Sequence, residues 1–173
     1  MKLSLLLLIS SAILAFSTSV NAQSVSIRVE QANKTEPPKD PKDRFTHTQK
    51  HALRVFVTNS SHEDLAVKIK YAFYGHAIDA HDLITVNSGE QDATVKPSDQ
   101  APVETTPVTV TYTDDHYPPG KGAKVKIMGT GNKVTGYGVQ VFVGDKLVGE
   151  SYEPASLKEQ ASKAAPVAAP PKK

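Results

Sequence analysis

Apolar and polar residues alternate with a period of two along most of the chain after Ser24. The clearest run extends from Leu65 to Phe73, where Leu, Val, Ile, Tyr and Phe alternate with Ala and Lys. Because successive side chains of a strand point to opposite faces, this alternation predicts β-strands with one buried face. Similar runs, some of them weaker, are found at Val25–Val29, Leu53–Thr58, Leu83–Val86, Ala93–Lys96, Val108–Tyr112, Lys124–Ile127, Val139–Val143 and Lys146–Tyr152.

Polar turns separate these runs, such as Asn59–Asp64 and Gly144-Asp145. About seven to nine short strands joined by such turns are typical of a β-sandwich. Each strand must bury one apolar face, and two sheets packed face to face satisfy that requirement most simply. The sequence therefore predicts an all-β antiparallel β-sandwich, with a small β-barrel as the alternative.

Two segments break the alternation. Asn33–Lys50 contains three prolines among charged residues, and we expect it either to lie across the sheets or to be mobile. The segment 154–173 is rich in Pro, Ala and Lys, a composition that buries too little apolar surface to fold. We expect it to form a flexible tail, with at most one helical turn between Ser156 and Lys163.

The N-terminus has the pattern of a secretory signal peptide. Lys2 precedes the apolar run Leu3–Phe16, and Val20-Asn21-Ala22 supplies the residues of a cleavage site. The apolar run is shorter than the ~20 residues that span a bilayer. We therefore expect residues 1–22 to be removed, a single domain over 23–153 and the tail over 154–173. The mature protein is expected to be secreted, periplasmic or at the cell surface, with no membrane span.

Composition narrows the chemistry. The chain has no cysteine, so the expected sandwich contains no disulfide, and thiol catalysis and Cys-based metal sites are excluded. The formal net charge is only +2, without a basic stripe, which argues against a nucleic-acid partner.

No catalytic or cofactor motif stands out, so we expect neither an enzyme nor a cofactor. His76, Asp79 and His81 form the best candidate for a metal site, although their spacing matches no known metal motif. His47 with His51, and Asp114-Asp115-His116, are two further groups of the same kind. An enzyme would require two of these groups to meet in one pocket.

Three aromatic residues are expected to point away from the core. If the valines and leucines around them face inward, then Phe56, Tyr74 and Phe142 face outward. Outward aromatics indicate a binding surface, unless the segment Asn33–Lys50 or a neighbouring strand covers them. The last hairpin, Val139–Tyr152, is expected at a sheet edge, where Lys146 and Glu150 would discourage unwanted strand pairing.

The pair of runs Leu53–Asn59 and Asp64–Tyr71 resembles an immunoglobulin-like B–C strand pair, and Tyr137–Val148 resembles the closing hairpin of that fold. The chain is similar in pattern to small secreted immunoglobulin-like proteins of verrucomicrobial gut bacteria, some of them associated with type IV pilus-like gene clusters. This resemblance implies an immunoglobulin-like sandwich and an accessory role in a pilus-like or cell-surface assembly. It carries no site residues to this chain.

We therefore expect a non-catalytic exported domain that acts in interactions or in a structure. Its partners would be other exported or surface proteins, and the expectation leaves room for a homo-oligomer. The alternatives are a module that binds a glycan or a metal, and a hydrolase whose site has no recognisable motif.

Overall fold

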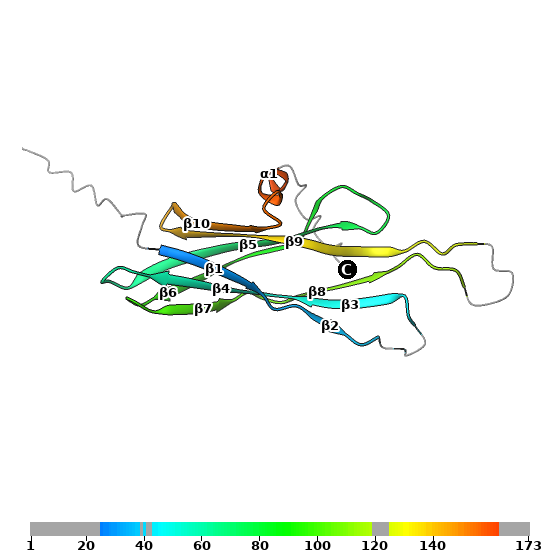
Figure 1. The fold of residues 1–173 in the computed structure, drawn as a ribbon, viewed down its shortest axis with the longest axis horizontal. Helices are drawn as coiled ribbons and strands as arrows, with labels where there is room; N and C mark the ends of the chain where they lie inside the picture. Colours follow the sequence, from blue (N-terminus) through cyan, green and yellow to red (C-terminus); the bar gives the residue numbers. More distant parts are fainter. Residues whose placement is uncertain (1–24, 39, 41–42, 119–124, 163–173) are drawn as a thin grey trace, which may run out of the picture.

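The computed structural model of the protein describes residues 25–38, 40, 43–118 and 125–162, so the expected signal peptide at 1–22 lies outside the described residues. Two antiparallel sheets, of three and seven strands, contain nearly all of the regular structure (Figure 1). The expected all-β sandwich is therefore confirmed. The strands are β1 (Val25–Gln31), β2 (Lys34–Glu36), β3 (Thr46–His51), β4 (Leu53–Asn59), β5 (Leu65–Ala77), β6 (Ile84–Val95), β7 (Gln100–Glu104), β8 (Val108–Thr113), β9 (Thr130–Val143) and β10 (Lys146–Glu153).

One layer of the sandwich consists of three long, bent ribbons. The order β1-β4-β7 in the smaller sheet is repeated as β2-β3-β8 in the larger one, and β3 and β4 are separated by Ala52 alone. The pairing of Gln31 with Leu53 continues in the same register to the pairing of Lys34 with Lys50. Where the assigned sheets change, the Ala32 N–H still donates to the Ala52 carbonyl at 2.8 Å. We call this continuous set of strands the three-ribbon layer.

The other layer has the strand order β10-β9-β5-β6, and we call it the four-stranded layer. Its longest strands, β5 and β9, run side by side along the elongated molecule (Figure 1). β6 is one continuous strand, because the two weak runs predicted at its ends belong to the same ladder with β5. Pairing with β5 thus makes polar residues such as Ser88 and Glu90 part of the strand, although no apolar pattern in the sequence predicts a strand there.

The core lies between the two layers and is made by the alternating residues that the sequence predicts. It is fully enclosed at its centre, where the largest buried side chains are Phe73, Leu53, Ile69, Val55, Val57, Val95, Val139 and Val141. Burial of each such side chain contributes about 1.5–3 kcal/mol relative to exposure. This apolar sandwich holds the outward-facing residues of β5 and β9 in fixed positions.

Three local predictions were wrong. Asn33–Lys50 was expected to lack strands, but it contains β2 and most of β3. These strands form because their polar residues are held by backbone pairing with neighbouring strands, which requires no apolar face. Of the strand expected at Lys124–Ile127, residues 125–127 are described and show only an isolated bridge between Ile127 and His116. The strand count is ten within the described residues, above the expected seven to nine.

A short helix, α1 (Leu157–Ala161), follows β10. This helix lies where the sequence allows a helical turn, between Ser156 and Lys163, and its Leu157 is buried. Residues 163–173 of the expected tail lie outside the described part. In that described part, no helix is long and apolar enough to cross a membrane.

Candidate interaction surface

The outward side of the four-stranded layer presents ordered rows of side chains. Strand register places each row across β10, β9, β5 and β6 in turn. We call this surface the outer face, and its rows are Leu147, Phe142, Lys68 and Asp92; Glu150, Gln140, Lys70 and Glu90; and Tyr152, Gly138, Ala72 and Ser88. Aromatic, amide and charged groups thus gather on one side of a rigid sheet.

Two tyrosines lie against a glycine in the third row. A Cβ atom on Gly138 would lie 2.5 Å from Tyr152 Cε1 and 3.3 Å from Tyr74 Cε2, so only glycine allows both rings this close to the backbone. Desolvation raises the pKa of both tyrosines above its usual value. Both phenols are therefore neutral, partly covered groups that can donate and accept hydrogen bonds.

The tyrosines border a small hollow of about 100 Å³. Lys70 and Gln140 also line this hollow, and Gln140 hydrogen-bonds to the Tyr152 side chain. An ammonium group, an amide and two phenols therefore converge around this hollow. Among the residues that line the hollow, the titratable ones are a lysine and three tyrosines.

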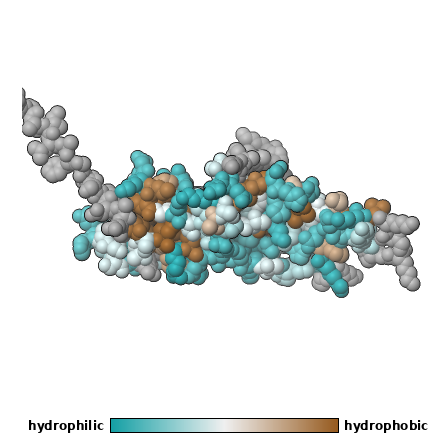
Figure 2. Space-filling model, turned by 45° about the horizontal axis from the view of Figure 1, so that its top comes forward, coloured by the Kyte–Doolittle hydropathy of each residue, from teal (hydrophilic) through white to brown (hydrophobic). Residues whose placement is uncertain are grey.

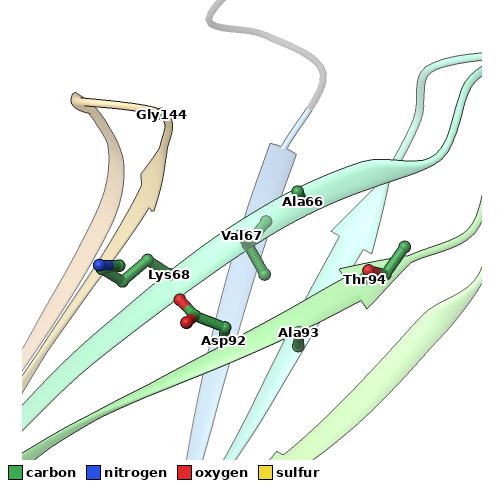
Figure 3. A pocket seen from close by; sticks show the side chains of 7 residues that line it. All are labelled: Ala66, Val67, Lys68, Asp92, Ala93, Thr94 and Gly144. Carbon is green, nitrogen blue, oxygen red and sulfur yellow. The ribbon is translucent and has the colours of Figure 1, made fainter.

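A larger hollow of about 410 Å³ lies at the end of the outer face, next to the β9–β10 turn (Figure 3). Its lining residues are Ala66, Val67, Lys68, Asp92, Ala93, Thr94 and Gly144. The hollow exists because Ala66, Thr94 and Gly144 are small, while the Lys68 and Asp92 side chains stand at one side of it. The hollow is open to solvent.

Charges on the outer face are largely paired with one another. Lys68 Nζ lies 3.9 Å from Glu90 Oε1, and Glu150 pairs with Lys158 of α1. Lys70 lies over the Phe142 ring, with its Nζ 5.3 Å from the ring centroid. This cation–π contact helps to keep Phe142 half-buried.

Helix α1 closes the opposite end of the outer face. Leu157 is only 3% exposed, and it packs at Gly136, where an added Cβ would lie 3.1 Å from Leu157 Cδ2. The same Cβ would lie 2.3 Å from the Glu153 carbonyl oxygen. The two glycines therefore leave space on β9: Gly136 for helix α1, and Gly138 for the two tyrosine rings.

The structure separates the three predicted aromatics. Tyr74 and Phe142 lie on the outer face, whereas Phe56 lies on the opposite layer, with the Arg28 guanidinium 4.2 Å from its ring centroid. All three are half-buried, and the contacts that cover Phe56 and Phe142 come from cations of neighbouring strands. Figure 2 accordingly shows hydrophobic groups that are interrupted by hydrophilic ones.

The three predicted metal ligands do not form a metal site in the described structure. His76 is half-buried, with Nδ1 2.9 Å from the Ala77 carbonyl oxygen, while Asp79 and His81 are exposed. Among the residues that the structure describes, no three His, Asp or Glu side chains are grouped in a way that could hold a metal ion.

Two of the histidine groups do meet, on the surface of the three-ribbon layer. His47 Nε2 lies 2.9 Å from Asp114 Oδ2, and the Phe45 ring stacks on His116 at a centroid distance of 4.1 Å. Neither His47 nor Asp114 lines any of the hollows described above, and the Asp114 side chain is 55% exposed. The pair is an exposed cross-strand contact, of the kind that adds little stability and offers no enclosed site.

Sequence reasoning missed Lys70, Gln140 and Tyr152 as neighbours of Tyr74. They belong to different strands, and only the register of β9 against β5 and β10 brings them together. The nearest signal in the sequence was the pair of glycines in Gly136-Tyr137-Gly138. Glycine inside a strand often marks close approach of other groups to the backbone.

No protein-family model and no curated protein matches the chain. The chain is similar in structure to a protein from Akkermansia muciniphila, a verrucomicrobial gut bacterium. That crystal structure aligns over 86% of this chain and 84% of its own, with a TM-score of 0.37 and 14% sequence identity.

Proposed function

We propose that this protein is a non-catalytic, exported interaction domain that binds another exported or cell-surface protein through its outer face. The observation that carries the proposal is the convergence of Tyr74, Tyr152, Gln140 and Lys70 around one hollow of the rigid four-stranded layer. Tyrosine and other aromatic residues are enriched at the centres of protein interfaces, where few rotatable bonds keep the cost of ordering low.

The setting that we propose is an accessory role in a cell-surface or pilus-like assembly. The support for it is the signal-peptide pattern of the first residues together with the sequence resemblance to secreted immunoglobulin-like proteins. A catalytic role receives no support from the hollows of the outer face. Their polar groups are lysine, aspartate, threonine, glutamine and tyrosine, without a nucleophile activated by an adjacent base.

The test uses the chain from Gln23 to Lys173, immobilised and exposed to the exported proteins of its own cells after mild cross-linking. Lys70→Glu reverses the central charge of the outer face, and Tyr152→Ala removes one wall of the hollow. Lys50→Glu is the matched control, because Lys50 is an exposed strand lysine on the three-ribbon layer, paired with Glu36.

The expected result is one specific partner that binds the unchanged protein and the Lys50→Glu control. Recovery of this partner should fall at least tenfold with Lys70→Glu and with Tyr152→Ala. Equal recovery with all four proteins, or no specific partner in repeated trials, would overturn the proposal. A glycan array gives the contrasting outcome: glycan binding that Tyr152→Ala abolishes would replace the protein partner by a carbohydrate.

A further inference from the structure

Strands β8 and β9 leave each other shortly after they begin to pair. Their ladder contains only two residue pairs, Tyr112 with Gly131 and Thr113 with Thr130. Gly131 has a φ of 95°, in the left-handed region, and beyond it β9 pairs with β5 in the other layer. Within the described part of the chain, Val108–Thr111 therefore have ladder pairs with β3 alone. On their other edge, Gly131 lies against the Thr111 carbonyl, and no described strand pairs with Val108–Val110.

A groove of about 290 Å³ lies along that edge. Four consecutive residues of β8 line it, and they include both the buried Val110 and the exposed Thr109 and Thr111. Since successive side chains of a strand point to opposite faces, a hollow lined by both kinds of residue lies beside the strand edge. Its remaining lining residues are Val86, Gly131 and Asn132.

The groove contains no charged lining residue, and this distinguishes it from the other strand edges. β6 carries Glu90 and Asp92, and β7 contains Pro102, which has no N–H to donate. β10 is closed against β1, because Gly149 lies against the Ile27 side chain. Charges, proline and covering contacts are the means by which proteins protect strand edges, and among the described residues the edge of Val108–Val110 lacks all three.

We infer that this edge of β8 accepts one extended peptide segment of another polypeptide, which adds a strand in the groove between β8 and β6. Backbone hydrogen bonds to the groups of Thr109 and Thr111 that point away from β3 would supply affinity, and alternate side chains of the peptide would enter the groove. Because the lining is uncharged and consists of valine, threonine, glycine and asparagine, the fitting segment alternates β-branched apolar residues with uncharged polar ones.

The test selects binders from a displayed library of random twelve-residue peptides on the immobilised chain from Gln23 to Lys173. The enriched peptides are expected to show the alternating, uncharged pattern. N-methylation of alternate backbone amides in a selected peptide should weaken binding at least tenfold, because it removes strand hydrogen bonds and keeps the side chains.

Substitutions test whether the peptide binds in this groove. Asn132→Trp fills the exposed rim of the groove and should reduce peptide binding at least tenfold, while Thr94→Trp, at the other hollow, should leave it unchanged. Lys70→Glu should also leave it unchanged, which keeps this inference separate from the outer-face proposal.

Three results would overturn the inference. The first is a library without enriched peptides, and the second is binding that tolerates both N-methylation and Asn132→Trp. The third is a concentration-dependent dimer of the chain that Asn132→Trp dissolves, because the occupant would then be a second copy. The N-methylation result does not depend on how well the variants fold.

Discussion

Asn59 provides the sharpest test of how the sandwich is held together at its β4–β5 turn. Its side chain is completely buried and makes four hydrogen bonds. Nδ2 donates to the Glu63 carbonyl at 2.8 Å and to the Val95 carbonyl at 3.0 Å. Oδ1 accepts from the Ser61 N–H at 2.9 Å and from the Ser61 hydroxyl at 2.6 Å. One amide thus joins the turn to the end of β6.

Replacing Asn59 by alanine removes all four bonds. The bond to Val95 is buried, so its loss leaves a carbonyl without a partner and costs about 1–3 kcal/mol. The other three are partly accessible, and water can replace them, so each costs about 0.5 kcal/mol. We therefore expect Asn59→Ala to lower the free energy of unfolding by about 3 kcal/mol.

The measurement is urea unfolding of the chain from Gln23, followed by far-UV circular dichroism. With an m-value of about 2 kcal/mol/M, the expected loss moves the midpoint by about 1.5 M. Asn59→Asp should be as harmful as alanine, because its carboxylate keeps the acceptor and faces two carbonyls without a donor. Ser60→Ala is the matched control, since Ser60 is the exposed neighbour. An Asn59→Ala loss below 1 kcal/mol would refute this account of the turn.

Three further predictions concern the junctions and the helix. Thr105 is buried and its hydroxyl accepts from the Leu53 N–H at 2.9 Å, so Thr105→Val should cost about 1–3 kcal/mol in urea unfolding and Thr105→Ser much less; equal losses would contradict this role of the hydroxyl. Burial lowers the pKa of His51, so the unfolded chain takes up a proton there at a higher pH, near about 6.5, than the folded protein does. The free energy of unfolding should therefore fall as the pH is lowered from 7.5 to 5, and His51→Gln should flatten that dependence; an unchanged slope would show that other groups cause it. Leu157→Ala should release α1 from Gly136 and cost about 2 kcal/mol, visible as faster amide exchange in β9 and β10, whereas Gln160→Ala, on the exposed side of the helix, should not change this exchange.

Much of the fold follows from local pattern. The alternation in Leu53–Thr58, Leu65–Phe73 and Val139–Val143 predicts strands whose inward residues are the ones found in the core. β2 and β3 could not be predicted in this way. Their residues, such as Lys34, Thr48 and Gln49, are extended because they pair with neighbouring strands, and no alternating apolar pattern accompanies that pairing. For the same reason β6 appeared as two weak pieces: its middle residues Ser88–Asp92 are polar and are held by the ladder with β5.

The candidate site was predictable only in part. Tyr74 and Phe142 could be assigned to the outward side from alternation, but Phe56 could not be assigned to the opposite layer, since alternation does not say which sheet a strand joins. The neighbours that make a surface of these aromatics, Lys70 and Tyr152, come from the register between strands that are far apart in sequence.

The sequence by itself determined the all-β class, the absence of disulfides, the expected export signal and the inward side of each main strand, because these depend on composition and on a period of two. The tertiary structure decided which ribbons bend from one sheet into the other, which charges cover the aromatics and which strand edge remains open. These features depend on pairing between segments that are distant in sequence. That pairing is made by backbone hydrogen bonds, which the pattern of side chains does not specify. That is why Val108–Thr111 reads as an ordinary strand in the sequence and as an open edge only in the folded protein.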